Sequence, residues 1–217
     1  MSEYRLIRGD CLDVLPTLTD GVDLVFFDPP YGVGIAEWDA TFTAHEAASL
    51  SLAKLKGGGS LYATCSLHIL PDMMRLIPYR RIIAWGKPNL PLRKNLREWE
   101  WSTEFVLWAT NGEPSIFNKP HGEDGRDYWR IPVENGFLRP DNFNHPARKP
   151  VALLRRIIEA STRSGDLVLD PFMGSASCGV ACLQTGRRYI GIERDAAYFD
   201  MAQERLAQAA QQVRLAL

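Results

Sequence analysis

Three acidic side chains, Asp28, Asp170 and Glu193, each end a short apolar run of the sequence. Ligands of open α/β sheets bind outside the carboxyl ends of the strands, so acids at these positions are candidates for contact with a polar ligand. For any one of them alone, the alternative is a carboxylate that caps the following helix. The residues around each acid bear on this choice.

The run Asp28-Pro29-Pro30-Tyr31-Gly32 is the most specific of these signals. Two consecutive prolines fix φ and remove two backbone donors, so the chain leaves the strand end in a rigid, extended turn. The turn offers the Asp28 carboxylate, the Pro29 carbonyl and the Tyr31 ring together. Two acceptors beside an aromatic plane match a flat group that carries an NH₂, such as the exocyclic amine of a base. The alternative, a merely structural Pro-Pro turn, does not call for this combination.

A second signal is the turn through Gly174 into a helix that is expected to start near Ser175. Gly174 would let a ligand approach the backbone, and the N–H groups at the helix start would face an anionic group such as a carboxylate. A phosphate loop is disfavoured because Val180 and Ala181 stand where Lys and Ser or Thr are required. The dinucleotide fingerprint fails as well, because Ala176 stands where its second Gly should be.

Glu193 follows Gly174 by 19 residues. An acid at this place in a nucleotide-binding α/β unit commonly accepts hydrogen bonds from ribose hydroxyls, so the spacing indicates a nucleoside. The alternative is a surface Glu193 that pairs with the neighbouring Arg194.

Apolar patterning predicts the elements that position these acids. Short, continuous apolar runs are typical of strands buried on both faces, as in a parallel sheet covered by helices. Strands are predicted over 4–8, 22–28, 59–64, 81–85, 104–109, 167–170 and 188–193. Helices are predicted over 44–55, 66–77, 150–163, 175–185 and 195–216. The alternation predicts a three-layer α/β domain, and it is broken over 111–145, where four Gly, four Pro and five Asn indicate short elements in a functional loop.

Length and composition agree with a single domain over 1–217. Apolar residues make up 46% and charged residues 24%, which excludes a disordered or fibrous chain. The net charge is −1, so any nucleic-acid surface must be local. The cysteines form no C-x-x-C pair, and no apolar run approaches the roughly 18 residues of a membrane span. A cytoplasmic protein with no metal site and no membrane contact is expected.

In several motifs the chain resembles the DNA amino-methyltransferases, which use S-adenosylmethionine to form N6-methyladenine or N4-methylcytosine. DPPYG looks like their catalytic motif, and LVLDPFMGSAS at 167–177 with RRYIGIERD at 187–195 looks like their cofactor motif. HPARKPVALLRRII at 145–158, GDCLDVLP at 9–16 and RIIAWGKPN at 81–89 also match. The catalytic motif comes first, as in the permuted β arrangement of the family; glutamine methyltransferases that act on proteins have the opposite order. The resemblance implies a seven-stranded, mostly parallel, Rossmann-like sheet.

The resemblance also implies roles for individual residues. Catalysis would fall to Asp28, Pro29, Pro30 and Tyr31. Asp10 would bind the adenine amine of the cofactor and Glu193 its ribose. The cofactor pocket as a whole would comprise Asp10, Cys11, Asp28, Lys149, Asp170, Phe172, Gly174, Ser175, Ala176, Ser177, Glu193 and Arg194.

Three of these pocket residues have another interpretation or depart from the family motif. For Lys149 the alternative is a cation near the start of the helix 150–163. The family usually has Gly in place of Ala176 and Thr in place of Ser177. A methyl group at position 176 is expected to tighten the approach of the methionine moiety.

Local clusters of basic residues predict contact with phosphates. Residues 75–97 carry seven cations and no acid, and a second cluster comprises Arg139, Arg148, Lys149, Arg155 and Arg156. The residues expected to bind DNA are Arg93, Lys94, Arg97, Arg126, Arg130 and Arg139. The segment 111–145, with Asn118 among its polar side chains, is expected to read base edges as an inserted recognition segment. The alternative in each case is a solvated surface.

An Asp before Pro-Pro-Tyr favours adenine N6 in double-stranded DNA as the target. Cytosine N4 is the first alternative, and a non-catalytic DNA-binding or cofactor-binding module that retained the fold is the second. A methyltransferase acting on structured RNA is a third. A homodimer is expected, because about 35 inserted residues offer little surface for holding a duplex.

Overall fold

The computed structural model describes residues 4–19, 21–30, 44–91, 97, 99–120, 122–134, 143 and 148–215. The strands are β1 (Tyr4–Arg8), β2 (Val22–Phe27), β3 (Leu55–Cys65), β4 (Tyr79–Gly86), β5 (Thr103–Thr110), β6 (Tyr128–Arg130), β7 (Leu167–Asp170) and β8 (Arg188–Glu193). The helices are α1 (Cys11–Thr17), α2 (Ala44–Ala53), α3 (Leu70–Leu76), η2 (Gly122–Gly125, a 3₁₀ turn), α4 (Val151–Ser161), α5 (Ser177–Gln184) and α6 (Ala196–Leu215). Across these residues no helix is long and apolar enough to cross a membrane.

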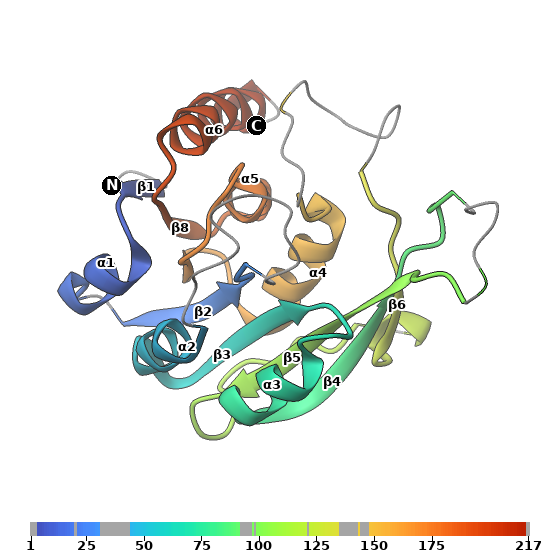
Figure 1. Ribbon diagram of the computed structural model, residues 1–217. Coiled ribbons are helices and arrows are strands. Elements are labelled where there is room, and N and C mark those ends of the chain that lie inside the picture. The colour runs from blue at the N-terminus through green and yellow to red at the C-terminus, as the bar shows by residue number, and fades with distance from the viewer. Residues whose placement is uncertain are drawn as a thin grey trace.

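The eight strands of the described residues form one sheet, in the order β1-β8-β7-β2-β3-β5-β4-β6 (Figure 1). β5 runs antiparallel to β3 and β4, and every other neighbouring pair is parallel. The mostly parallel α/β sheet is therefore confirmed, whereas the expected count of seven strands is wrong. The additional strand, β6, lies inside the segment 111–145, and its three residues are too few to show a strand period in the sequence.

Two hydrophobic cores lie on opposite faces of the sheet. Helices α4, α5 and α6 cover one face, and α1, α2 and α3 cover the other (Figure 1). In β2, Leu24 and Phe26 belong to the first core, while Val25 and Phe27 belong to the second. Because successive side chains of a strand point to opposite faces, a strand between two cores is apolar throughout. The short apolar runs of the sequence thus correspond to a three-layer domain.

The parallel strands end at one edge of the sheet, which we call the carboxyl edge. β2 ends immediately before Asp28, β7 ends at Asp170 and β8 ends at Glu193, while Asp10 follows β1 closely. β5 runs the other way, so it begins at this edge, where Thr103 pairs with the last residue of β4. The segment between β4 and β5 is therefore brought to the same edge as the acids.

Three helix starts at the carboxyl edge differ from the prediction, and one of them is that of α3, which begins at Leu70 instead of at residue 66. The sequence pattern does not indicate α1, which is seven residues long and contains a proline. Asp10 caps this helix, because its Oδ1 accepts a hydrogen bond from the Leu12 N–H at 2.9 Å. α5 begins at Ser177 instead of near Ser175, because Ala176 adopts a left-handed backbone conformation.

Candidate active site

Asp170 is buried at the end of β7 and accepts two hydrogen bonds. Its Oδ1 accepts one from the Phe172 N–H and its Oδ2 accepts one from the Tyr189 hydroxyl, both at 3.1 Å. Burial, with smaller contributions from the charges of Asp28 and Glu193, raises the pKa of Asp170 to about 8 against the lowering effect of these hydrogen bonds. The ionised form of such a carboxyl is stabilised by any cation that comes to lie nearby.

Glu193 fixes the loop that follows β7. Its Oε2 accepts a hydrogen bond from the Gly174 N–H at 2.8 Å, and its Oε1 accepts one from the Asp195 N–H at 2.9 Å. Burial raises the pKa of Glu193. The neighbouring Arg194 has an ion pair with Asp10, at 3.7 Å between Nη1 and Oδ2. A carboxylate has about four acceptor positions, so Glu193 can take further donors such as ribose hydroxyls.

Ala176 stands in this loop with φ 56° and ψ 36°. That conformation costs an L-residue about 1–2 kcal/mol, and Gly adopts it freely. The methyl group of Ala176 is fully buried and belongs to the core beneath α4, α5 and α6. The expectation that this methyl tightens the approach of a methionine moiety therefore finds no support in the structure.

Arg205 of α6 holds the same loop from inside the protein. It is only 2% exposed, and its Nη1 donates hydrogen bonds to the Ser175 carbonyl at 2.8 Å, the Ser175 hydroxyl at 3.2 Å and the Ser177 hydroxyl at 2.9 Å. Hydrogen bonds from a charged donor are stronger than those between neutral groups. Both serine hydroxyls of the predicted cofactor pocket thus help to hold the loop in shape.

Asp28 lies in a network of buried charges. Its Oδ1 accepts hydrogen bonds from Lys149 Nζ at 2.8 Å and from the Thr64 hydroxyl. Lys149 Nζ also lies 3.8 Å from Oε2 of Glu104, whose Oε1 accepts a hydrogen bond from Lys87. Burial disfavours the charge on Lys149, but Asp28 and Glu104 outweigh it and raise its pKa. Lys149 is therefore a buried, charged side chain that pairs with Asp28, and it also lies two residues before the start of α4, as the alternative expected.

The start of α4 is fixed around Lys149. The Val151 N–H donates to Glu134 Oε1 at 2.8 Å, and Arg148 pairs with Glu134 Oε2 at 2.8 Å. The Arg148 side chain is 3% exposed. Arg148 and Lys149 therefore point inward, so the second basic cluster is not, as a whole, a surface for DNA.

Asp10 and Cys11 lie at the start of α1. Asp10 uses Oδ1 to cap the helix, and Oδ2 faces Arg194. Cys11 is 6% exposed and packs in the core beneath α1, α2 and α3. Burial, with the nearby Asp10, raises the pKa of its thiol to about 12, so the thiol is unreactive at neutral pH. A contact between Cys11 and a cofactor would have to come from its backbone.

Three of the residues expected to bind DNA, Arg97, Arg126 and Arg130, are exposed in the structure. Arg130 ends β6 beside Gly86, at the carboxyl edge. The remaining predicted residues lie outside the described residues: Arg93, Lys94 and Arg139, together with the catalytic candidate Tyr31.

The basic run 75–97 is divided by β4. Arg80 and Arg81 lie at the start of this strand, on the edge opposite the carboxyl edge, and they pair with Glu113 at 3.0 Å and Asp127 at 3.7 Å. Lys87 follows the end of the strand and contacts Glu104 inside the protein. The run is therefore not one continuous surface, and its part beyond Lys87 is the part that the topology brings to the carboxyl edge.

The segment 111–145 is likewise divided between the two edges. Asn111 follows β5, and its Nδ2 donates to the Leu55 carbonyl at 3.0 Å. Asn118 Nδ2 donates to the Glu159 carbonyl at 2.9 Å, near the end of α4. Both amides serve the fold at the edge opposite Asp28, so the expectation that Asn118 reads a base is wrong. β6 leads the chain back toward the carboxyl edge.

Three residues that support the site were not predicted from the sequence: Thr64, Glu104 and Arg205. Thr64 and Glu104 lie at the ends of predicted strands. Thr64 meets Asp28 because β3 lies parallel beside β2, and Glu104 reaches the same edge because β5 runs antiparallel; no local pattern shows either pairing. A signal for Arg205 does exist, because it shares the buried face of α6 with Ala202 and Leu206. A cation on the apolar face of a helix needs a buried partner.

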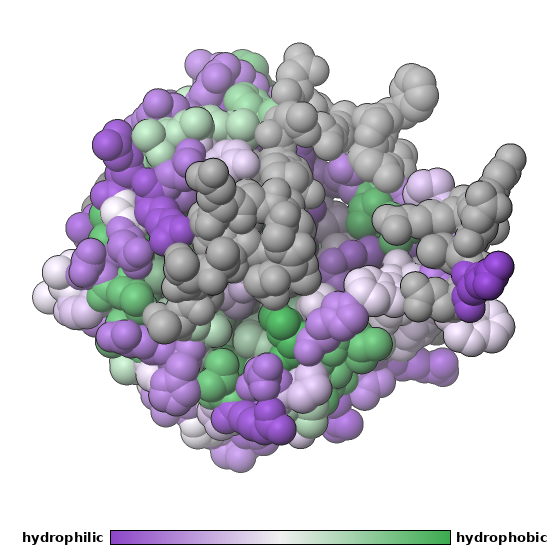
Figure 2. All heavy atoms as spheres, viewed as in Figure 1, coloured by the Kyte–Doolittle hydropathy of each residue, from purple (hydrophilic) through white to green (hydrophobic). Residues whose placement is uncertain are grey.

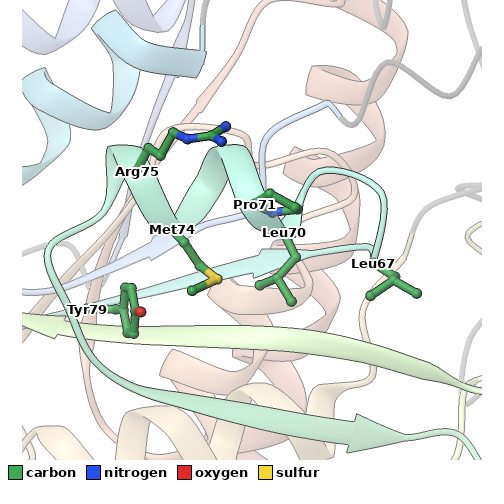
Figure 3. A pocket seen from close by; sticks show the side chains of 6 residues that line it. All are labelled: Leu67, Leu70, Pro71, Met74, Arg75 and Tyr79. Carbon is green, nitrogen blue, oxygen red and sulfur yellow. The ribbon is translucent and has the colours of Figure 1, made fainter.

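A cavity of about 420 Å³ lies beside α3. Figure 3 shows the side chains that line it, Leu67, Leu70, Pro71, Met74, Arg75 and Tyr79. Hydrophobic side chains gather on the surface around α3 (Figure 2). None of the acids described above lines this cavity, so it is separate from the site at the carboxyl edge.

The carboxyl edge suits a nucleoside that carries a positive charge, as S-adenosylmethionine does. Asp170 and Glu193 are buried carboxyls with raised pKa values, and neither forms an ion pair within the described part of the chain. A sulfonium or ammonium group would compensate their charge. Gly174, with φ 50°, presents backbone without a side chain between them. Over the same residues, no group of three or more His, Cys, Asp or Glu is placed to hold a metal ion.

Comparison with known proteins gives consistent matches. A family model described as DNA methylase, of the N6 and N4 methyltransferase type, matches residues 22–204. The Type II methyltransferase M2.MboI of Moraxella bovis is 29% identical over 93% of this chain and 87% of its own length. M2.DpnII of Streptococcus pneumoniae, also a Type II methyltransferase, is 29% identical over 93% of this chain and 88% of its own length.

Solved structures agree with this match. The crystal structure of the M1.HpyAVI complex with SAM has a TM-score of 0.78 and 29% identity, over 94% of this chain and 98% of that chain. The cytosine-N4-specific PvuII DNA methyltransferase shares the fold, with a TM-score of 0.72 and 20% identity over 98% of this chain and 93% of that one. With the family model spanning most of the sequence and the acids placed as above, the chain belongs to the DNA methylase family and is an S-adenosylmethionine-dependent DNA amino-methyltransferase.

Proposed function

We propose that this enzyme methylates N6 of adenine at specific sites in double-stranded DNA. The observation that carries the proposal is the placement of Asp28. It stands at the end of the central strand β2, directly before Pro29 and Pro30, with its carboxylate held by Lys149 at 2.8 Å. An acceptor fixed before the substrate arrives needs no reorganisation when charge develops in the transition state.

The chemistry that Asp28 has to support is attack by a weak nucleophile. The exocyclic amine of adenine donates its lone pair into the ring. Hydrogen bonds from its two N–H groups to the Asp28 carboxylate and the Pro29 carbonyl would hold the nitrogen toward tetrahedral geometry, with the lone pair directed out of the ring plane. S-adenosylmethionine, when bound, supplies the electrophilic methyl group. Asp28 stabilises the positive charge that grows on the nitrogen, and a proton is released afterwards.

Lys149 and Glu104 adjust the charge of Asp28. Lys149 alone would neutralise the carboxylate that has to stabilise a growing positive charge. Glu104, at 3.8 Å from Lys149 Nζ, shares the same cation, so Asp28 keeps part of its negative potential. Thr64 adds a neutral hydrogen bond and fixes the orientation of the carboxylate without cancelling its charge.

The target base must leave the duplex to reach Asp28, at a cost of a few kcal/mol. Tyr31, in the turn after Pro30, is proposed to stack on the extruded base, which is worth about 1–3 kcal/mol. The same acceptors would also bind the amine of cytosine, so N4-methylation is the alternative; Asp at position 28 favours adenine by the resemblance of DPPYG to the family motif. The intact DPPYG argues against a non-catalytic module.

Identification of the modified nucleoside tests this proposal. The enzyme is incubated with methyl-labelled S-adenosylmethionine and genomic DNA that lacks methylation, and the DNA is digested to nucleosides and analysed by mass. We expect labelled N6-methyl-2′-deoxyadenosine, and none with Asp28→Ala. Labelled N4-methyl-2′-deoxycytidine would establish the alternative, and absence of label in DNA would refute the proposal. Sequencing of the methylated sites then gives the target sequence.

We propose that the recognition of that sequence lies in the part of 111–145 that follows β6, near Arg130 at the carboxyl edge. A homodimer that acts in the cytoplasm completes the proposal. All four cysteines are free and buried thiols, as a reducing compartment requires. Light scattering at micromolar concentration tests the dimer, and a fully active monomer would contradict it.

A further inference from the structure

Two tryptophans in the segment between β4 and β5 are exposed to an unusual degree. Trp99 is 94% exposed and Trp101 is 62% exposed. Tryptophan is strongly buried on average, because its indole presents a large apolar surface. An exposed large aromatic side chain is therefore informative, and an adjacent pair of them indicates a surface that meets a partner.

The topology places both indoles at the carboxyl edge. Trp101 lies two residues before β5, and Glu104 of that strand lies 3.8 Å from Lys149, which holds Asp28. Trp101 also packs edge-to-face against His68, with ring centroids 4.3 Å apart. His68 follows the end of β3, the strand that pairs with β2. Both tryptophans thus lie on the segment that precedes β5, and Trp101 connects it to the segment that follows β3, beside the carboxyl edge.

The charge of the surrounding segment fits nucleic acid. Residues 87–102 carry four cations, Lys87, Arg93, Lys94 and Arg97, and two acids, Glu98 and Glu100. Lys87 is engaged with Glu104 inside the protein, whereas Arg97, two residues from Trp99, is exposed. Exposed aromatic rings within a net positive segment are typical of surfaces that stack on bases while cations contact the phosphates.

We propose that Trp99 and Trp101 form an aromatic platform that stacks on DNA bases beside the extruded target. The inference rests on the proposed function, since it concerns the bases that lose a stacking neighbour when the target leaves the duplex. Trp101, held by His68, is the fixed part of the platform, and Trp99 is the part that contacts the bases. The platform would compensate for lost stacking in the duplex, while Asp28 and Pro29 bind the base that has left it.

The test compares variants on two duplexes that carry one target site, found by sequencing the sites that the wild-type enzyme methylates. One duplex is fully paired, and the other has an abasic position opposite the target, which makes extrusion easier. The variants are Trp99→Ala, Trp101→Ala, Trp99→Phe and, as control, Leu215→Ala, which removes an apolar side chain that is 88% exposed on α6. DNA affinity is measured by fluorescence anisotropy, methyl transfer as kcat/KM, and the fold by circular dichroism.

We expect Trp99→Ala to lower affinity and kcat/KM for the paired duplex by about 5- to 150-fold, the value of one base stacked on an aromatic ring. The losses of affinity and kcat/KM for Trp101→Ala should lie in the same range. The loss should be smaller on the abasic duplex, Trp99→Phe should retain most of the activity, and Leu215→Ala should match the wild type. Equal loss on both duplexes, or no loss on the paired duplex, would overturn the platform.

A platform that serves another partner gives a different result. If Trp99→Ala dissociates a dimer in light scattering while affinity for DNA is unchanged, the indoles belong to an interface between two copies of the chain, and the inference is wrong. Failure of the proposed function is recognised separately, at the sequencing step. Methylation of cytosine N4 would refute adenine as the target but would still supply a site for both duplexes, and the anisotropy measurement would then decide on the platform. Absence of any methylated site would refute the proposed function before the variants are compared.

Discussion

Replacement of Lys149 by methionine is the most direct test of the charge network at the carboxyl edge. The side chain is 8% exposed, and its Nζ lies 2.8 Å from Asp28 and 3.8 Å from Glu104. Methionine retains most of the volume and removes the charge. The variant therefore leaves two largely buried carboxylates facing each other without the cation between them.

The expected loss follows from these distances. At an effective dielectric constant of about 20, the attractions of Lys149 to Asp28 and Glu104 amount to about 6 and about 4 kcal/mol. Desolvation of the buried ammonium opposes them by several kcal/mol. Removal of one partner of a buried ion pair costs about 3–5 kcal/mol in measured cases. We expect Lys149→Met to lower the free energy of unfolding by this amount at pH 7.

The control is Lys56→Met. Lys56 Nζ also lies 2.8 Å from a carboxylate oxygen, that of Asp23, but its side chain is 46% exposed. Exposed pairs contribute about 1 kcal/mol or less, so the two variants differ in burial and not in distance. Urea unfolding followed by circular dichroism measures both. Equal losses for Lys149→Met and Lys56→Met at pH 7 would refute the argument from burial.

The pH dependence gives a second check on the same variant. The pKa of Lys149 is raised in the folded protein, so its stabilising effect is fully present below the ordinary value of 10.5 and disappears as the pH rises through the higher folded value. The difference between wild type and Lys149→Met should therefore persist up to about pH 10 and should shrink as the pH rises further, and a difference that stays constant through the alkaline range would contradict the role of the Lys149 charge.

Four further predictions concern the cofactor loop and the DNA surface. Burial raises the pKa of Asp170 to about 8, so folded Asp170 keeps its proton where the unfolded chain has lost it, and the stability of the free protein should fall as the pH rises from about 4 to 8. Binding of the cationic cofactor should then release a proton below pH 8; calorimetry in buffers of different ionisation enthalpy measures this, and Asp170→Asn should reduce it. Glu193→Ala should weaken cofactor binding at least tenfold in calorimetry while Asp28→Ala leaves it near normal, and equal losses would contradict the assignment. Affinity for DNA should fall steeply with salt in anisotropy despite the net charge of −1, and a flat response would mean that the exposed arginines are ordinary solvated groups. Ala176→Gly relieves about 1–2 kcal/mol of strain but loses about 0.8 kcal/mol of methyl burial and about 0.5–1 kcal/mol through the flexibility of the unfolded chain, so thermal stability and cofactor affinity should both stay close to wild type.

The sheet could be predicted from the sequence because its central strands are apolar on both faces. β2 and β7 stand between two cores, and continuous apolar runs have no other simple explanation in a chain of this composition. β6 and α1 could not be predicted, because both are too short to show a periodic pattern. Three residues cannot display a strand period, and a seven-residue helix with a proline inside has too few turns to display a helical one.

The site residues that lie at the ends of parallel strands could be predicted from the sequence. The residues that strand pairing brings to them from elsewhere in the chain could not. Asp28, Asp170 and Glu193 each follow a buried strand, so their common edge follows from the parallel arrangement. Glu104 reaches the same edge because β5 runs antiparallel, and no periodicity in the sequence reports strand direction. The prediction for Asn118 was wrong for the same reason: β5 ends at the edge opposite Asp28, so the segment that follows it starts there.

The single antiparallel strand, β5, also affects where the cofactor side of the sheet and the proposed DNA side meet. The strands from β2 through β7 and β8 to β1 bring together the acids and the glycine loop that fit the cofactor. On the other side of β2, the reversal at β5 returns the chain between β4 and β5 to the carboxyl edge, with Arg97, Trp99 and Trp101 on it. Asp28 directly follows β2, between the two halves, and Lys149 pairs with both Asp28 and Glu104 of β5. A wholly parallel sheet would place the start of β5 at the opposite edge, so the reversal is what puts Asp28, the proposed catalytic carboxylate, between the residues that fit the methyl donor and the residues proposed to meet the DNA.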